Sequence, residues 1–270
     1  MGALQFPNTM EIRANVYSPL QNTAVRLGAW LYDLVPIEDV IEAFVDLGGP
    51  HTFRDGGLLD LLRTIKELTS TLIDAPFDGP ILTLALSGPG QVPALPAGSR
   101  AAQLASASKE GALVLGGVDK HHAWALIPDR GTNATAWDLL EVEGFRPMLT
   151  AVSPGEADQL LSQATEQSAR IIQSSGYASL APKSLQNPRL TVGMLSDFYD
   201  TPGLPFAVPP RSAKLFARAD RVAAIAETVQ GIIGDHSLDP QLISLWSHIR
   251  TARMAGVNYA LAEFARDYHS

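Results

Sequence analysis

Apolar and polar residues alternate most clearly between residues 10 and 17. A period of two places the apolar positions on one face of a β-strand. These positions are Met10, Ile12, Ala14 and Val16. A second apolar run, residues 81–86, is continuous and indicates a strand buried on both faces. Three further strand candidates follow, separated only by turn signals: 113–118, 122–127 and 135–142. Such short connections favour an antiparallel meander.

Apolar residues elsewhere recur every three to four positions, which predicts amphipathic helices. Ser18 and Ser153 each stand three residues before a Gln or Glu, the spacing of a helix-starting capping box. Helices are expected over 19–34, 36–48, 55–72, 99–109, 153–174, 187–198, 212–233 and 240–268. The last two are joined by a short polar segment, so we expect them to form an αα-hairpin.

These patterns together predict an α+β fold. Its sheet is expected to have four to five strands, mixed or antiparallel, packed by helices and followed by the long C-terminal helical hairpin. The expected division places an α+β domain with the central meander at residues 1–180. A helical C-terminal subdomain, residues 181–270, is expected to pack on it.

Composition narrows the classes of function. The chain has 270 residues, 46% of them hydrophobic, no cysteine and a formal net charge of -8. Without cysteine there is no disulfide framework, thiolate metal site or thiol nucleophile. The acidic balance argues against a nucleic-acid partner. No apolar stretch is long enough for a membrane span and no signal peptide is visible, so we expect a cytoplasmic protein without membrane contact. The excess of Arg over Lys and the abundant Ala are typical of a GC-rich bacterium.

His121 and His122 are the first candidates for chemistry, since they closely follow Asp119. In a strand, however, consecutive side chains point to opposite faces and cannot hold one ion. We therefore expect no metal and no cofactor, and keep both histidines only as ligand-binding or acid–base candidates. Phosphate-loop, dinucleotide-binding and nucleophile-elbow motifs are absent from the sequence. A helix start at Ser99 can hold an anion, although we favour a simple capped helix as the explanation.

A basic stripe on the first long C-terminal helix is the second candidate. Its four cations, at spacings of three or four, are Arg211, Lys214, Arg218 and Arg221. They lie near the helix N-terminus, where the helix dipole disfavours cations, so negative partners are expected. The partners are either acidic residues of the chain, such as Asp197, Asp200 or Asp220, or a bound anion or acidic protein.

Arg253 is the third candidate because it interrupts an apolar stripe. On a helical wheel it falls within an arc of about 80° formed by apolar residues of the last helix. These are Leu242, Trp246, Ile249, Val257, Ala260 and Phe264. A charge at this position needs an internal partner or access to water. We predict a structural salt bridge, with an anion-binding crevice as the alternative.

Two functions remain open at this stage. The first is a non-catalytic binding or interaction protein with a surface for an anion or an acidic partner. The alternative is an enzyme acting on a small anionic substrate held by the arginines of the C-terminal hairpin. The apolar arc of the last helix is also unusually wide. We therefore expect it to be covered on several sides by its own chain, with part of it forming a homodimer contact.

Overall fold

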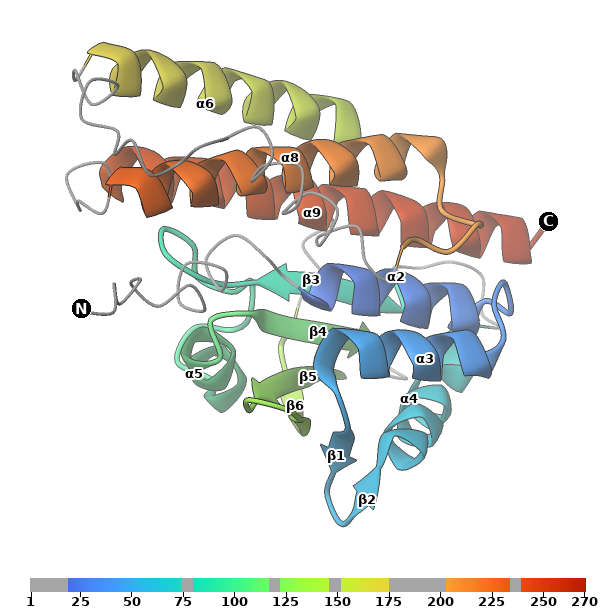
Figure 1. The fold of residues 1–270 in the computed structure, drawn as a ribbon. Coiled ribbons are helices and arrows are strands. Elements are labelled where there is room, and N and C mark those ends of the chain that lie inside the picture. Colours follow the sequence, from blue (N-terminus) through green and yellow to red (C-terminus); the bar gives the residue numbers. More distant parts are fainter. Residues whose placement is uncertain (1–18, 74–79, 117–121, 146–151, 175–202, 234–238) are drawn as a thin grey trace, which may run out of the picture.

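The computed structural model describes residues 19–73, 80–116, 122–145, 152–174, 203–233 and 239–270 (Figure 1). Within these residues the helices are α2 (Pro19–Leu31), α3 (Ile37–Gly48), α4 (Leu58–Ile73), α5 (Arg100–Ala107), α6 (Pro154–Ser174), α8 (Pro210–Ile233) and α9 (Asp239–Tyr268). Each lies close to a helix predicted from the sequence. The strand predicted at residues 10–17 and the helix predicted at 187–198 lie outside the described residues.

The sheet contains six strands in the order β2-β1-β6-β5-β4-β3. The strands are β1 (His51–Phe53), β2 (Gly56–Gly57), β3 (Leu82–Leu86), β4 (Gly111–Gly116), β5 (His122–Arg130) and β6 (Thr135–Glu143). Strands β3 to β6 form the predicted antiparallel meander. Strand β1 joins β6 in parallel and turns back into β2, so the sheet is mixed.

The expectation of four to five strands was therefore wrong. The two additional strands have only three and two residues, too few for an alternating pattern to be visible in the sequence. Strand β2 consists of Gly56 and Gly57, which carry no side chain to mark a face.

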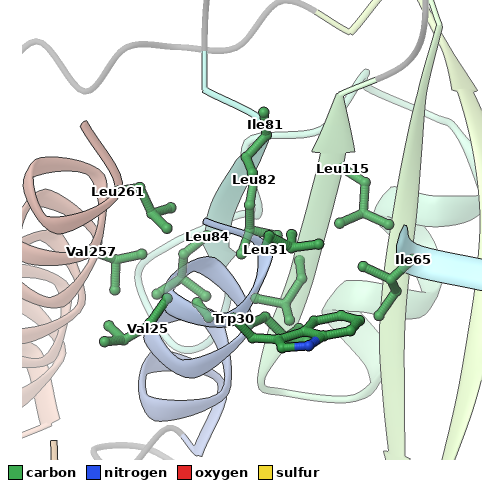
Figure 2. Close-up of a cluster of buried hydrophobic side chains, with 14 of the residues drawn as sticks. Val25, Trp30, Leu31, Ile65, Ile81, Leu82, Leu84, Leu115, Val257 and Leu261 are labelled. Atoms are coloured by element: carbon green, nitrogen blue, oxygen red, sulfur yellow. The ribbon is translucent and has the colours of Figure 1, made fainter. Parts of the chain in front are cut away.

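The two faces of the meander are buried against different helices. In β4, Leu113 and Leu115 belong to the large core shared with α2, α4 and α9, whereas Ala112 and Val114 pack with α5. Figure 2 shows α2 between the strands and α9, with Trp30 and Leu31 directed toward the sheet. Complete burial of one such leucine contributes about 1.5–3 kcal/mol. The sheet therefore lies between two helical layers.

Helix α9 is covered on several sides, as its wide apolar arc predicts. Its first half, including Trp246 and Ile249, packs with α6 and α8. Its second half, including Val257 and Phe264, packs with α2 and the sheet. Gly28 of α2 allows a close approach, because a Cβ there would lie 2.0 Å from Leu261 Cδ2. No described helix combines the length and the apolar character needed to cross a membrane.

Helices α8 and α9 lie side by side (Figure 1). The residues between them, 234–238, lie outside the described part of the chain. The helical hairpin therefore stays a prediction, although both of its long helices are present. The capping box before α6 is confirmed, since Ser153 Oγ accepts from the Glu156 N–H at 3.3 Å and Glu156 accepts from the Ser153 N–H at 2.8 Å.

Candidate functional site

The predicted basic stripe forms an exposed surface on α8. We call this surface, made of Arg211, Lys214, Arg218 and Arg221, the basic face. All four side chains are exposed. Because α8 begins at Pro210, they occupy about its first three turns. The helix dipole opposes a cation in the first turn, where Arg211 lies, by about 0.3–1 kcal/mol, and the effect falls off in the following turns.

Intramolecular partners account for only part of the basic face. Arg218 Nη1 lies 2.8 Å from Asp158 Oδ2 on α6, and both side chains are nearly half exposed. The Arg211 guanidinium lies 5.7 Å from the centre of the Tyr259 ring, a cation–π contact. Lys214 and Arg221 form no ion pair with any residue in the described part of the chain. The expected internal acid is thus present for Arg218.

Arg253 lies in the interior, as its position on the apolar stripe predicts. Its side chain is 2% exposed, and its Nη1 atom lies 2.7 Å from Asp220 Oδ1 of α8. The same nitrogen donates to Gln21 Oε1 of α2 at 2.6 Å. The predicted structural salt bridge is confirmed. Arg253 joins three helices and is separate from the exposed basic face.

Arg250, at the edge of the same stripe, holds the loop that follows β3. Its Nη1 donates to the carbonyl of Pro89 at 3.0 Å, and burial lowers its pKa to about 10. Gly88 has a φ of +150° and lies so close that a Cβ would meet the Arg250 guanidinium. Ser99 Oγ accepts from the Ala102 N–H, so the candidate helix start at α5 is an ordinary N-cap.

Only one of the two histidine candidates lies within the described residues. His122 is exposed at the start of β5, opposite Glu143 of β6, and His121 lies outside the described residues. Among the described residues no group of three or more His, Asp or Glu side chains can hold a metal ion.

Two of the shallow hollows on the described surface lie away from the candidate residues. One, of about 440 Å³, lies beside the end of α2 and is lined by Trp30 and residues 33–37. The other, of about 450 Å³, lies on α6 between Gln163 and Arg170. Neither contains a basic-face residue, Arg253 or His122.

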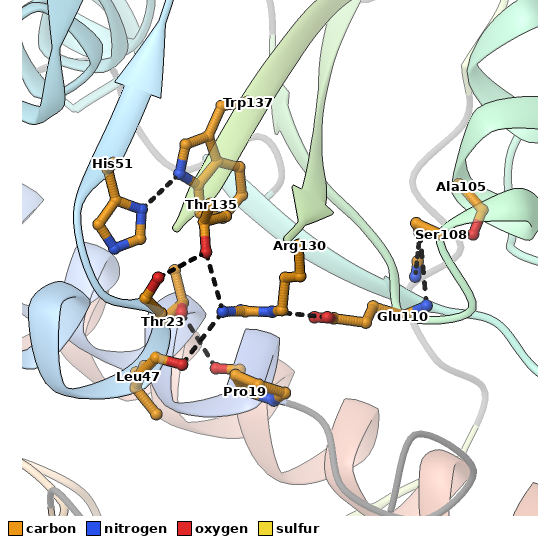
Figure 3. Close-up of polar contacts among 12 residues, drawn as sticks. Pro19, Thr23, Leu47, His51, Ala105, Ser108, Glu110, Arg130, Thr135 and Trp137 are labelled. Carbon is orange, nitrogen blue, oxygen red and sulfur yellow. Dashed lines mark hydrogen bonds and ion pairs between the residues drawn. The ribbon is translucent and has the colours of Figure 1, made fainter. Parts of the chain in front are cut away.

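A buried polar cluster at the junction of β1, β6 and α3 was not predicted from the sequence (Figure 3). His51 accepts at Nδ1 from Trp137 Nε1–H at 2.8 Å, and its Nε2 lies 2.7 Å from the Phe44 carbonyl oxygen. Thr135 Oγ1 donates to the Gly48 carbonyl at 3.0 Å. The cluster therefore ties the end of α3 to β6.

Arg130 and Glu110 extend this cluster as a largely buried ion pair, with side chains 19% and 11% exposed. Arg130 Nη1 also donates to the carbonyl of Leu47, in the last turn of α3, at 3.1 Å. A cation there is favoured by the helix dipole. Burial raises the pKa of Glu110, and the charge of Arg130 partly offsets that rise. No local sequence signal marks the cluster, since its partners are far apart in the chain.

The fold and the surface define an α+β protein with an exposed cationic helix, and its described part contains no group of three or more His, Asp or Glu side chains that could hold a metal ion. Two family models match the chain in order. The model for the N-terminal domain of Rv1486c-like proteins covers residues 22–152, and the model for their C-terminal domain covers residues 155–254. The chain belongs to the Rv1486c-like family. No curated protein and no solved structure gives a significant match.

The two matched segments meet where α6 begins. Helix α6 packs on α8 and α9, with Ala157 and Leu161 in their shared core. The sequence patterns place the division of the chain at residue 180 instead, and that division stays a prediction.

Proposed function

We propose that this chain is a non-catalytic binding protein whose basic face on α8 docks against an acidic surface of a partner protein. The observation that supports this most directly is the exposure of Lys214 and Arg221 on the N-terminal half of α8. Neither forms an ion pair within the described part of the chain. An acidic partner would offset both the dipole and the mutual repulsion of the cations.

The length of the basic face favours an extended partner over a small anion. From Arg211 to Arg221 the helix rises about 15 Å, at roughly 1.5 Å per residue. A single phosphate or carboxylate group does not span that distance. The overall charge of -8 disfavours nucleic acid as the extended partner. An acidic protein segment fits both the length and the charge.

The alternative of an enzyme for a small anion has less support. Such an enzyme needs a concave site that encloses its substrate. The two hollows described above contain none of the candidate arginines or His122. Arg253, the candidate nearest the core, is bound to Asp220 and Gln21.

The test measures binding of a short poly-glutamate peptide and of inorganic phosphate by isothermal titration calorimetry. The variant Lys214→Gln/Arg221→Gln removes two charges from the basic face. The matched control Arg63→Gln/Lys66→Gln removes two exposed charges from α4, on a different helix. We expect the peptide to bind, with at least about tenfold loss in the α8 variant only, and with weakening at higher salt.

The outcomes separate the alternatives. Equal weakening in both double variants would indicate general charge attraction and would contradict a specific basic face. Tight phosphate binding that the α8 variant abolishes would instead favour the small-anion alternative. Absence of peptide binding to the unaltered protein would overturn the proposal.

Self-association through the C-terminal helices belongs to the same proposal. Ile225 of α8 and Leu160 of α6, two helices that pack on α9, are each 38% exposed. A homodimer using these helices should give twice the chain mass of 28.9 kDa in light scattering at high concentration. A monomer mass under those conditions would exclude the dimer.

A further inference from the structure

We propose that the hydrogen bond between His51 and Trp137 is an acid-sensitive latch, which holds the β1–β2 hairpin on β6 and opens when His51 takes up a second proton. The inference is independent of the proposed partner surface on α8. It concerns the end of the sheet formed by β2 and β1, where β1 is the short strand that connects α3 to β2.

The hydrogen-bond partners determine which nitrogen of His51 carries its proton. The Phe44 carbonyl can only accept, so Nε2 is the protonated nitrogen. The Trp137 indole can only donate, so Nδ1 must be bare. A second proton on Nδ1 would face the indole N–H directly. Charging His51 therefore requires the two rings to separate.

The surroundings of His51 oppose a positive charge as well. His51 is 8% exposed and packs with the rings of Phe44 and Trp137 in a cluster of three, with ring centres 5.2 and 6.0 Å from its own. Burial lowers the pKa of His51, the hydrogen bond to the Phe44 carbonyl partly offsets this, and the Arg130 guanidinium of β5 adds a smaller lowering, so that the net shift is downward. Glu110 is paired with Arg130, and Asp60 of α4 accepts from Gly57 N–H in the hairpin. Arg54, in the turn between β1 and β2, lies over the Phe53 ring at 4.8 Å from its centre.

The latch acts on a short strand pairing, beside two further attachments of the hairpin: Phe53 lies in the large core, and Asp60 of α4 accepts from the Gly57 N–H. Strand β1 pairs with β6 over only three residues, His51 to Phe53. His51 lies beside Thr135 in that register, and Phe53 lies beside Trp137. The His51–Trp137 hydrogen bond therefore joins the first residue of β1 to the residue of β6 that lies beside the last residue of β1. Loss of this bond removes that side-chain connection.

The direction of the pH effect follows from proton linkage. The closed state lowers the pKa of His51 below the ordinary 6.5, whereas an opened hairpin exposes the imidazole to water. The opened state therefore binds more protons as pH falls below 6.5. Opening should become easier by up to about tenfold per pH unit, and the effect should level off once the closed state also takes up the proton.

The experiment measures amide hydrogen exchange of the full chain by NMR. The pH is varied from about 7.5 to about 4.5, which extends roughly one unit above and two units below an ordinary histidine pKa. After correction for intrinsic exchange, protection of the Thr52 amide, which faces β6, should fall by several-fold to tenfold per pH unit. Amides of β4 should keep their protection. The Trp137 indole N–H signal, assigned with Trp137→Phe, should shift or broaden over the same range.

Two variants make the test specific. His51→Gln retains one donor and one acceptor but cannot titrate, so acid opening should disappear. His248→Gln removes an exposed histidine of α9 and should leave acid opening intact. Unchanged Thr52 protection in the unaltered folded protein would overturn the latch. Loss of protection in β1 and β4 together, which indicates global unfolding, would overturn it as well.

Discussion

Asp220 and Arg221 follow one another in α8 and have opposite surroundings. Asp220 is 7% exposed and pairs with Arg253 in the interior, whereas Arg221 is exposed on the basic face. A helix turns about 100° per residue, so one step along the chain moves a side chain from the core to the solvent. The comparison shows that a charged side chain on a helix can either stabilise the fold or remain available to bind a partner. Burial decides between these roles, because desolvation makes an interior charge costly unless it is paired.

The largest expected effect is at the interior pair. Arg253→Met keeps much of the side-chain volume but leaves Asp220 without its arginine, so the free energy of unfolding should fall by about 3–5 kcal/mol. Urea denaturation measures the change. The double variant Arg253→Met/Asp220→Leu replaces both charges by apolar groups and should recover most of the loss. Unchanged stability of Arg253→Met would mean that the Arg253–Asp220 ion pair does not stabilise the fold.

An intermediate effect is expected at Arg130, whose pair with Glu110 is less deeply buried. Arg130→Met removes the bonds to the Leu47 carbonyl and Thr135 as well as the charge opposite Glu110. Loss of such charged hydrogen bonds should reduce the free energy of unfolding by roughly 1.5–3 kcal/mol. Arg130→Lys keeps the charge without the forked geometry and should fall in between. A loss larger than that of Arg253→Met would reverse the proposed ranking by burial.

The smallest effect is expected on the basic face. Arg218→Gln breaks an exposed pair with Asp158 and should cost less than about 1 kcal/mol, with less loss at high salt. Arg221→Gln should change stability by no more than roughly 0.5 kcal/mol. Thermal and urea denaturation of both variants provide the measurement. A loss of several kcal/mol in either variant would show that the basic face contributes to assembly and would weaken its proposed role in binding.

The helices and the meander were predictable because their signals are local. The buried run at β3, the capping box at Ser153 and the turn residues between β5 and β6 each lie within a few positions of the feature they mark. Arg253 was predictable for a similar reason, since its conflict with the apolar stripe is visible within one helix. The identity of its two partners was not predictable from within that helix. Asp220 lies in α8, and Gln21 lies 232 residues away in the chain.

The cluster around His51 shows what local patterns miss. His51 and Trp137 are 86 residues apart and meet only because β1 inserts in parallel beside β6. Neither the three-residue strand nor its parallel register leaves a periodic signal. The sequence therefore predicted the interior salt bridge of Arg253, but it gave no sign of the hydrogen bonds that hold His51.

The position of α2 between the sheet and α9 has a consequence for protein synthesis. Helix α2 is the first described element to leave the ribosome, and α9 is the last. The buried side of α2 that contacts Val257 and Leu261 remains uncovered until α9 has been made (Figure 2). Chains interrupted before α9 should therefore expose apolar surface and require protection by chaperones.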